Sequence, residues 1–212
     1  LYTHTPLVTR EFIETIASFD NICNYIDFPV QHTETEVLKM MGRGDTTAKI
    51  FSKVKLMREI IPDIIIRTSI ITGFPGETPK LFSRMKKNLN ELRFDRLGVF
   101  PYSREEGTPA YSMHDQINLG TAKKRSESIM KQQQEISLEK NTALIGKKFK
   151  VLIDRNENGY SVGRTYGDSP DVDNEVLIKG KLEAGEFYSV KITEADEFDL
   201  YGLNLTERTF PF

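Results

Sequence analysis

The sequence predicts an α/β protein in which part of a parallel (β/α) barrel is followed by a small antiparallel β-barrel of five strands. Three observations lead to this prediction. Strand and helix patterns alternate through the first 145 residues, as in parallel strands joined by helices. The strands in this part are apolar on one face and polar on the other, and five short strand patterns separated by turn residues follow a long helix pattern. The 212 residues suffice for one large domain or two modest ones.

The first half of the chain contains three predicted strands with a helix in each interval. Strands are predicted at residues 25–30, 64–72 and 96–100, where apolar and β-branched residues gather. In the two intervals, apolar residues recur at the spacing of one helix face. They are Ile50, Val54, Met57 and Ile61 in the first helix and Leu81, Met85, Leu89 and Leu92 in the second. Thr78 is the expected N-cap of the second helix, and Pro79 its first residue.

Polarity alternates along these strands. Ile26, Phe28 and Val30 point to one face of the first strand and Asp27, Pro29 and Gln31 to the other, while Arg67 and Ser69 share a face of the second. An open sheet covered by helices on both faces would be apolar on both, so the polar face predicts a barrel interior or a cleft that holds a ligand. Three strands cannot close a barrel. The stub Leu1–Tyr2 and the helix pattern at 9–17 read as the tail of a preceding unit, so we expect a fragment without the front half of the barrel.

The second half begins with a long amphipathic helix and continues with short strands. A seven-residue repeat of apolar residues predicts a helix from Thr121 to Leu144 that ends at Gly146. The five strands are predicted at residues 148–155, 160–166, 175–179, 187–194 and 198–205. We therefore expect three parts: a half-barrel at 1–120, a linking helix at 121–145 and a small β-barrel at 146–212.

Polar and glycine residues gather where the predicted parallel strands end. The run Gly73-Phe74-Pro75-Gly76-Glu77-Thr78 follows a strand and opens a helix, which suits either a ligand-binding loop or a tight connection. Gln31 and His32 close the first strand at the same rim, where such residues are commonly caps. Gln31, His32 and the glycine-rich run are expected at the same rim as the polar face of the second strand. Because barrel ligands bind at the carboxyl ends of the strands, this arrangement favours a ligand site.

Composition excludes several classes of protein. The single cysteine, Cys23, allows no intramolecular disulfide and no metal cluster built from this chain's own thiolates; we expect it to be a small buried side chain. No run approaches the roughly 20 apolar residues of a membrane span, so we expect a cytoplasmic protein with no membrane partner. No catalytic residue and no metal ligand is assigned.

The charge is unevenly distributed along the chain. The net charge is −2, but residues 1–145 carry 20 Lys and Arg against 18 Asp and Glu, whereas residues 146–212 carry 9 against 13. Because phosphate binding relies on Lys and Arg, the acidic second part favours a basic protein partner over a nucleic acid.

Several runs of the sequence resemble the radical S-adenosylmethionine methylthiotransferases. They are Asp-Phe-Pro-Val-Gln-His at 27–32, Arg-Thr-Ser-Ile-Ile-Thr-Gly-Phe-Pro-Gly-Glu-Thr at 67–78, Phe-Asp-Arg-Leu-Gly-Val-Phe at 94–100 and residues 102–109. Gly-Arg-Thr-Tyr-Gly-Asp-Ser-Pro at 163–170 is similar to the TRAM domain of the same family. The resemblance covers nearly the whole chain and implies a partial radical S-adenosylmethionine barrel followed by a TRAM barrel.

The resemblance also implies an activity and a cofactor site. In this family a 4Fe-4S cluster and S-adenosylmethionine generate a deoxyadenosyl radical, and a second 4Fe-4S cluster delivers the methylthio group. The residues implied to line the S-adenosylmethionine site are Gln31, His32, Arg67, Ser69, Gly73, Phe74, Val99 and Phe100.

Two branches of the family differ in substrate, one modifying a tRNA adenosine and the other the β-carbon of an aspartate in small-subunit ribosomal protein twelve. His32, in a place where the tRNA branch typically has Ser, resembles the ribosomal branch, and so does the acidic second part. The tRNA branch and a protein-binding module without chemistry remain the alternatives. The cluster cysteines have no counterpart here, so the chain alone is expected to be inactive. In the glycine-rich motif, Ser69 replaces the first glycine and Glu77 comes one residue late.

Overall fold

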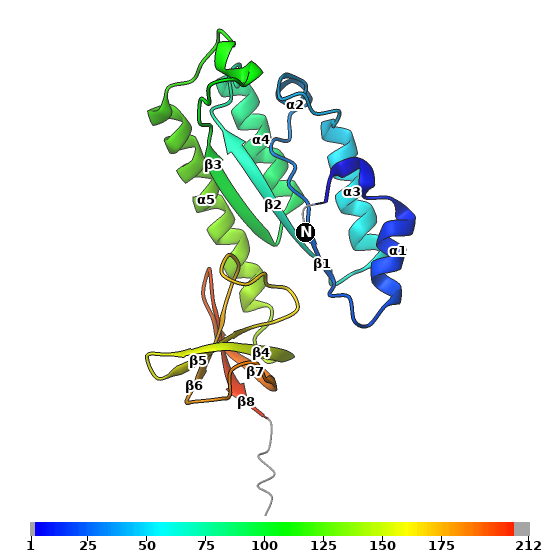
Figure 1. The fold of residues 1–212 in the computed structure, drawn as a ribbon, viewed down its shortest axis with the longest axis vertical. Coiled ribbons are helices and arrows are strands. Elements are labelled where there is room, and N and C mark those ends of the chain that lie inside the picture. Colours follow the sequence, from blue (N-terminus) through cyan, green and yellow to red (C-terminus); the bar gives the residue numbers. More distant parts are fainter. Residues whose placement is uncertain (1–2, 206–212) are drawn as a thin grey trace, which may run out of the picture. The chain divides into compact units, whose positions relative to one another are not determined.

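A computed structural model describes residues 3–205 and divides the chain into two compact units, residues 1–133 and 134–212 (Figure 1). The stub Leu1–Tyr2 lies outside the described residues. Helix α5, Leu119–Thr142, contributes residues to both units. The three-part division at 120 and 145 stays a prediction.

Unit 1 contains the predicted parallel sheet. Its strands are β1 (Tyr25–Asp27), β2 (Ile65–Thr72) and β3 (Arg96–Pro101), in the order β1-β2-β3. The first strand is shorter than predicted because the Thr68 hydroxyl replaces part of the ladder, accepting from the Val30 N–H at 3.2 Å and donating to the Phe28 carbonyl at 2.8 Å.

Helices flank the strands in the predicted alternation. They are α1 (Arg10–Ser18), α2 (Thr35–Met40), α3 (Thr47–Ile60), α4 (Pro79–Leu92) and α5, with short 3-10 helices at Thr5–Leu7 and Pro109–Ser112. The Thr78 hydroxyl caps α4 by accepting from the Leu81 N–H, and Thr9 and Thr46 cap α1 and α3 in the same way. Helix α2 was not predicted, because its six residues are too few to show a helical repeat.

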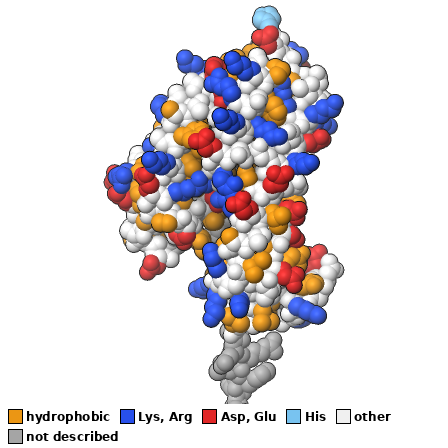
Figure 2. Space-filling view, turned by 180° about the vertical axis from the view of Figure 1, so that it is seen from behind, with side chains coloured by type: hydrophobic (Ala, Val, Ile, Leu, Met, Phe, Trp, Pro, Cys, Tyr) orange, Lys and Arg blue, Asp and Glu red, His pale blue; other side chains and the backbone are white. Residues whose placement is uncertain are grey.

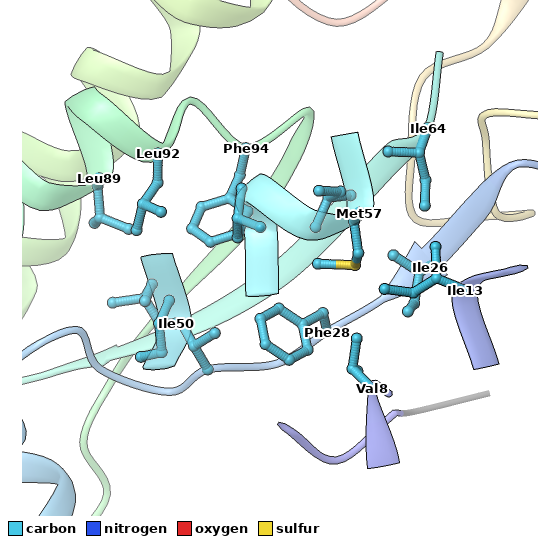
Figure 3. Packing of buried hydrophobic residues seen from close by; sticks show 14 of the residues in the cluster. Val8, Ile13, Ile26, Phe28, Ile50, Met57, Ile64, Leu89, Leu92 and Phe94 are labelled. Carbon is cyan, nitrogen blue, oxygen red and sulfur yellow. The ribbon is translucent and has the colours of Figure 1, made fainter. Parts of the chain in front are cut away.

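The core of unit 1 joins one face of the sheet to α1, α3 and α4 (Figure 3). Ile26 and Phe28 of the first strand segment pack with Ile13, Met57 and Leu89 from the three helices, and all five side chains are buried. The other face of the sheet carries the half-buried residues that alternate with the buried ones along β2. This is the polar face, where the sequence predicts a ligand.

Unit 2 is a closed barrel preceded by the last turns of α5. Its strands are β4 (Lys148–Glu157), β5 (Tyr160–Arg164), β6 (Val176–Lys179), β7 (Phe187–Ala195) and β8 (Leu200–Asn204), in the order β4-β5-β6-β8-β7. The predicted antiparallel barrel of five strands is confirmed, with one exception: β6 and β8 pair in parallel. Directions cannot alternate all the way round a closed ring with an odd number of strands, so one of the five pairs must be parallel.

The barrel interior is filled by aliphatic side chains. They are Val151, Ile153, Val176, Ile178, Leu182, Val190, Ile192 and Leu200. Gly163 lets β4 and β5 approach, since a Cβ there would lie 3.0 Å from the Leu152 carbonyl carbon and closer still to its oxygen. Within residues 3–205, no helix combines the length and apolar character needed to cross a membrane.

Candidate functional site

The three parallel strands of unit 1 end at one edge of the sheet. Gln31 pairs with Ile70 as an isolated parallel bridge beyond the end of β1. Its N–H donates to the Ser69 carbonyl at 2.8 Å, and its carbonyl accepts from the Ile71 N–H at 2.8 Å. Gln31 has a φ of 66°, a left-handed conformation that side-chain-bearing residues seldom adopt. The backbone at this edge is therefore both strained and firmly hydrogen-bonded.

Strand register places Ser69 and Phe100 on the same face. Ser69 lies opposite Gly98, and Ile71 lies opposite Phe100. Phe100 is 54% exposed, and its ring atoms come within 3.0 Å of the place where a Cβ on residue 98 would stand. Because Gly98 has no side chain, the Phe100 ring can lie over residue 98, and the face offers this exposed ring beside the Ser69 hydroxyl.

Arg67 lies on this face nearer the beginning of the strands. It stands between Asp27 and Arg96 in the register, and its Nη1 donates to Asp27 Oδ2 at 3.2 Å. The two side chains of this ion pair are each 13% exposed. The Arg67 charge is thus already partly balanced within the protein.

The structure does not bring Val99 together with these residues. Val99 lies opposite Ile70, which is fully buried in the core of unit 1, and it packs against that core. Consecutive strand residues point to opposite faces, so Val99 and Phe100 cannot both present side chains to one ligand. A role for the Val99 side chain at the cofactor stays untested and would require contact from the core side.

The turn after β2 is fixed by close packing against α5. Gly73 has a φ of 77°, and a Cβ there would lie 3.0 Å from Ala122 Cα and closer still to Ala122 Cβ. The Thr72 hydroxyl adds a hydrogen bond to the Ala122 carbonyl at 2.9 Å. Packing therefore requires glycine at this position, independently of any ligand.

The N–H groups of this turn are largely used inside the protein. Gly73 donates to Glu77 Oε1 at 3.1 Å, Gly76 to the Asp115 carbonyl at 2.9 Å, and Glu77 to the Phe74 carbonyl at 2.9 Å. Phe74 is only 6% exposed, and its ring meets that of Tyr102 edge to face, with centroids 5.2 Å apart. The turn therefore shapes the rim more than it offers free donors for an anion.

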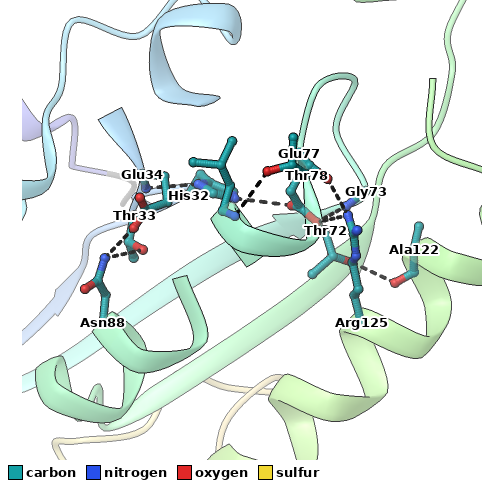
Figure 4. A network of polar contacts seen from close by, with 11 residues as sticks. His32, Thr33, Glu34, Thr72, Gly73, Glu77, Thr78, Asn88, Ala122 and Arg125 are labelled. Carbon is teal, nitrogen blue, oxygen red and sulfur yellow. Dashed lines mark hydrogen bonds and ion pairs between the residues drawn. The ribbon is translucent and has the colours of Figure 1, made fainter. Parts of the chain in front are cut away.

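His32 lies inside a buried polar network below this rim (Figure 4). Its Nδ1 accepts from the Glu34 N–H at 3.0 Å, and its Nε2 lies 3.2 Å from Glu77 Oε2. Since Nδ1 is an acceptor, the proton resides on Nε2, which donates to Glu77. His32 and Glu77 are both fully buried, so the imidazole supports the rim and does not line its open face.

Arg125 of α5 balances the charge of Glu77. Its Nη1 donates to Glu77 Oε1 at 2.6 Å and to the Glu77 carbonyl at 2.8 Å, and the Arg125 side chain is 9% exposed. Arg125 was not among the residues predicted for the site. A signal was present, because Arg125 lies three residues after Ala122 and four before Ile129, on the apolar side of the helix.

Glu34 is a second buried carboxylate at this edge. Its oxygens accept from Asn88 Nδ2 at 2.7 Å and pair with Arg84 Nη2 at 2.7 Å. Burial raises the pKa of Glu34 above its ordinary value, against the opposing influence of the Arg84 charge. Both elements that follow strands β1 and β2 are thus anchored by buried carboxylates.

Metal ligation has little support in the described part of the chain. Among residues 3–205, no three or more His, Cys, Asp or Glu side chains are grouped so that they could hold a metal ion. Cys23 is exposed, contrary to the expectation of a buried thiol.

Comparison with known proteins matches both units to families. Residues 1–88 match the Radical SAM superfamily and residues 145–204 match the TRAM domain. The chain is also similar to the Escherichia coli coproporphyrinogen III oxidase HemN, a radical SAM enzyme, with a TM-score of 0.55 and 20% identity over 65% of this chain and 32% of that one. That similarity concerns the fold alone.

Curated relatives extend over nearly the whole chain. The ribosomal protein uS12 methylthiotransferase RimO of Christiangramia forsetii is 45% identical over 92% of this chain and 45% of the relative. The protein of the same name from Clostridioides difficile is 44% identical over 95% of this chain and 46% of the relative. The chain thus spans about half the length of the curated relatives it matches. The resemblance found in the sequence is confirmed: the chain belongs to the radical S-adenosylmethionine methylthiotransferases.

Proposed function

We propose that this chain provides part of the S-adenosylmethionine site and the substrate-recognition barrel of a methylthiotransferase that acts on ribosomal protein uS12. The observation that carries the proposal is 44–45% identity, over more than nine-tenths of the chain, to proteins of that name. The finer proposal is that a methylthio group is added to the β-carbon of an aspartate. A ribosomal protein substrate places the reaction in the cytoplasm.

The open face of the sheet suits the adenosine part of S-adenosylmethionine. The exposed Phe100 ring offers a stacking surface for a base, and glycine at 98 lets this ring lie close over the strand. Ser69 and Gln31 supply a hydroxyl and an amide that can hydrogen-bond ribose hydroxyls. When bound, S-adenosylmethionine supplies the reactive adenosyl and methyl groups, while these residues bind and orient it.

The residues of this chain do not fit an iron–sulfur cluster. Such clusters are held by several cysteine thiolates, whereas this chain has one cysteine, which is exposed. We therefore propose that the chain alone is catalytically inactive. The two 4Fe-4S clusters of the family would need ligands that this chain does not contain.

The acidic turns of unit 2 are the proposed contact for uS12, a basic protein. The Glu175 N–H donates to Asp199 Oδ1 at 3.0 Å, which joins the turn at 168–175 to the turn at 194–199. Burial raises the pKa of Asp199 above its ordinary value, and the neighbouring Asp196 and Glu175 charges add to the shift. The fold thus holds like charges together, an arrangement that a cationic partner would relieve.

On the face of unit 1 seen in Figure 2, Lys and Arg side chains are interspersed with Asp and Glu. Beside the acidic turns of unit 2 lies a cleft of about 110 Å³. Its lining carries four carboxylates, those of Asp154, Asp171, Asp173 and Glu175, against two guanidinium groups, those of Arg155 and Arg164, which pair with Glu175 and Asp154. A cationic side chain of uS12 would find both charge and a recess at this place.

One observation supports the tRNA branch as a second candidate. Cross-strand register places Lys148 opposite Lys191 and Lys150 opposite Ser189 on the outward face of β4 and β7. Lys150 Nζ lies 4.3 Å from the centre of the exposed Phe187 ring. Within residues 3–205 these three lysines have no ion-pair partner, and like charges in direct opposition are destabilising. The net acidity of the unit therefore conceals one basic face.

Binding of the full chain to purified uS12 and to tRNA, each over a series of salt concentrations, tests the proposal. We expect salt-sensitive binding to uS12 that the double variant Asp171→Asn/Asp173→Asn weakens by about 2- to 30-fold, the range for two exposed charge pairs. The matched control Glu183→Gln/Glu186→Gln removes two acids elsewhere in the unit. Preference for tRNA, lost in Lys148→Glu/Lys191→Glu, would favour the second candidate. Equal affinity of Asp171→Asn/Asp173→Asn and of Glu183→Gln/Glu186→Gln for uS12 would refute the proposed contact.

A further inference from the structure

We infer that His32 is a positioning residue that, through Glu77, holds Gln31 in its left-handed conformation and ties it to the turn after β2. The inference rests on the proposed function, because Gln31 and that turn form the rim of the proposed S-adenosylmethionine site. It assigns His32 no contact with the ligand, since the imidazole is fully buried.

Gln31 needs an external restraint to keep its conformation. A φ of 66° is unfavourable for any residue with a Cβ, and such residues persist only where the surroundings over-determine them. The two hydrogen bonds to β2 fix the N–H and carbonyl of Gln31. They do not fix the direction in which the chain leaves, and this direction is set by the residues that follow.

The three residues after Gln31 are all anchored, His32 by the turn after β2 and Thr33 and Glu34 by α4. Both ring nitrogens of His32 are bonded, Nε2 to Glu77 and Nδ1 to the Glu34 N–H. The Thr33 hydroxyl accepts a hydrogen bond from Asn88 Nδ2 at 3.1 Å, and the Glu34 carboxylate forms an ion pair with Arg84 of α4. Among these anchors only His32 reaches the turn after β2. If Gln31 relaxed to an extended conformation, the chain direction would change and His32 would leave Glu77.

Glu77 makes the link between the two rim segments. Its Oε2 accepts from His32, and its Oε1 accepts from the Gly73 N–H and from Arg125. One buried carboxylate therefore receives donors from the end of β1, from the turn after β2 and from α5. Removing the His32 donor leaves part of this charge unsatisfied in a buried place and takes away one of the contacts that hold the carboxylate against the Gly73 N–H.

Two substitutions separate the contacts of His32. In His32→Asn the amide can reach the position of Nδ1 and keep the Glu34 contact, but it is too short to reach Glu77. In His32→Gln the amide nitrogen can reach the position of Nε2 and keep the Glu77 contact. Thr33→Val is the matched control, because it removes a buried hydrogen bond of the next residue without touching Glu77.

Amide hydrogen exchange of the full chain, followed by NMR at Gln31 and Gly73, provides a test that needs no ligand. We expect exchange at both amides to rise about 10- to 150-fold in His32→Asn, the factor for losing a hydrogen bond to a charged group. In His32→Gln and Thr33→Val we expect changes below about threefold once global stability is matched with a low concentration of urea. Equal effects of His32→Asn and His32→Gln, or no effect of either, would overturn the inference.

Titration of the same proteins with S-adenosylmethionine links the positioning to binding. We expect His32→Asn to raise the dissociation constant about tenfold or more and His32→Gln to restore it to within about threefold of wild type. Binding that is unchanged in His32→Asn, despite faster exchange, would overturn the link to the site. Failure of the wild-type chain to bind would count against the proposed cofactor site, while the exchange measurement would still decide the role of His32.

Discussion

Replacing Gly73 by alanine tests the packing of the turn after β2 against α5. An added Cβ would meet Ala122 at both Cβ and Cα, and the φ of 77° is itself unfavourable for alanine. The left-handed conformation costs about 1–2 kcal/mol, and overpacking adds about 1–3 kcal/mol. We therefore expect Gly73→Ala to lower the free energy of unfolding of unit 1 by about 2–5 kcal/mol.

Urea unfolding followed by circular dichroism measures this loss, and two variants divide it. Gly107→Ala is the matched control, because Gly107 has a φ of 78° but no atom within 4 Å of the added Cβ. It should cost only the conformational part, about 1–2 kcal/mol. In a double-mutant cycle, Ala122→Gly should recover about 1–3 kcal/mol of the Gly73→Ala loss. Equal losses in Gly73→Ala and Gly107→Ala, or no coupling to Ala122, would refute the close-packing argument.

Three further predictions follow from individual contacts. Thr78→Ala removes the cap of α4 and should cost about 1 kcal/mol in urea unfolding, whereas Thr78→Ser should stay within a few tenths. Gln31→Gly should be more stable than Gln31→Ala by about 1 kcal/mol, because glycine tolerates the left-handed φ; equal stability would mean that the residue is unstrained. For Asp199 the folded pKa lies above the ordinary value of 3.8, so the folded state holds the proton more tightly and stability falls as pH rises from about 4 through the folded pKa. Asp199→Asn keeps an acceptor for the Glu175 N–H but cannot titrate, so the unfolding free energy should fall less between about pH 4 and 7 than in the wild type. An unchanged dependence on pH would contradict the raised pKa of Asp199.

The fold was largely predictable because its elements carry local signals. The apolar spacing through Ile50, Val54 and Met57 specified α3, and Thr78 with Pro79 specified the start of α4. Helix α2 gave no such signal, since six residues span fewer than two turns. The parallel β6–β8 pair was predictable in principle from the odd number of strands in a closed barrel, although no residue marks it.

The site was less predictable because its supports are distant in sequence. His32 and Glu77 are 45 residues apart, and Glu77 and Arg125 are 48 apart, so no local pattern reveals that they meet. The place of His32 at the end of the first strand and the family resemblance suggested a ligand contact, whereas the structure buries it as a support for the rim. Strand alternation could have separated Val99 from Phe100, since neighbouring residues of one strand cannot share a face.

Charge summed over a segment proved a coarse guide to its surface. The second part of the chain is acidic overall, yet Lys148, Lys150 and Lys191 share the outward face of β4 and β7. Partner recognition by this unit therefore depends on which face is used, and net charge does not decide it.

Hydrogen–deuterium exchange of the full chain, with and without purified uS12, tests most directly whether the acidic turns of unit 2 recognise the ribosomal protein. We expect uS12 to slow exchange in residues 166–175 and 194–199, and we expect Asp171→Asn/Asp173→Asn to reduce this protection. Exchange in β4 and β7 at Lys148 and Lys191 should be unchanged by uS12. Protection of the basic face with none in the acidic turns, or protection by tRNA and not by uS12, would contradict the account.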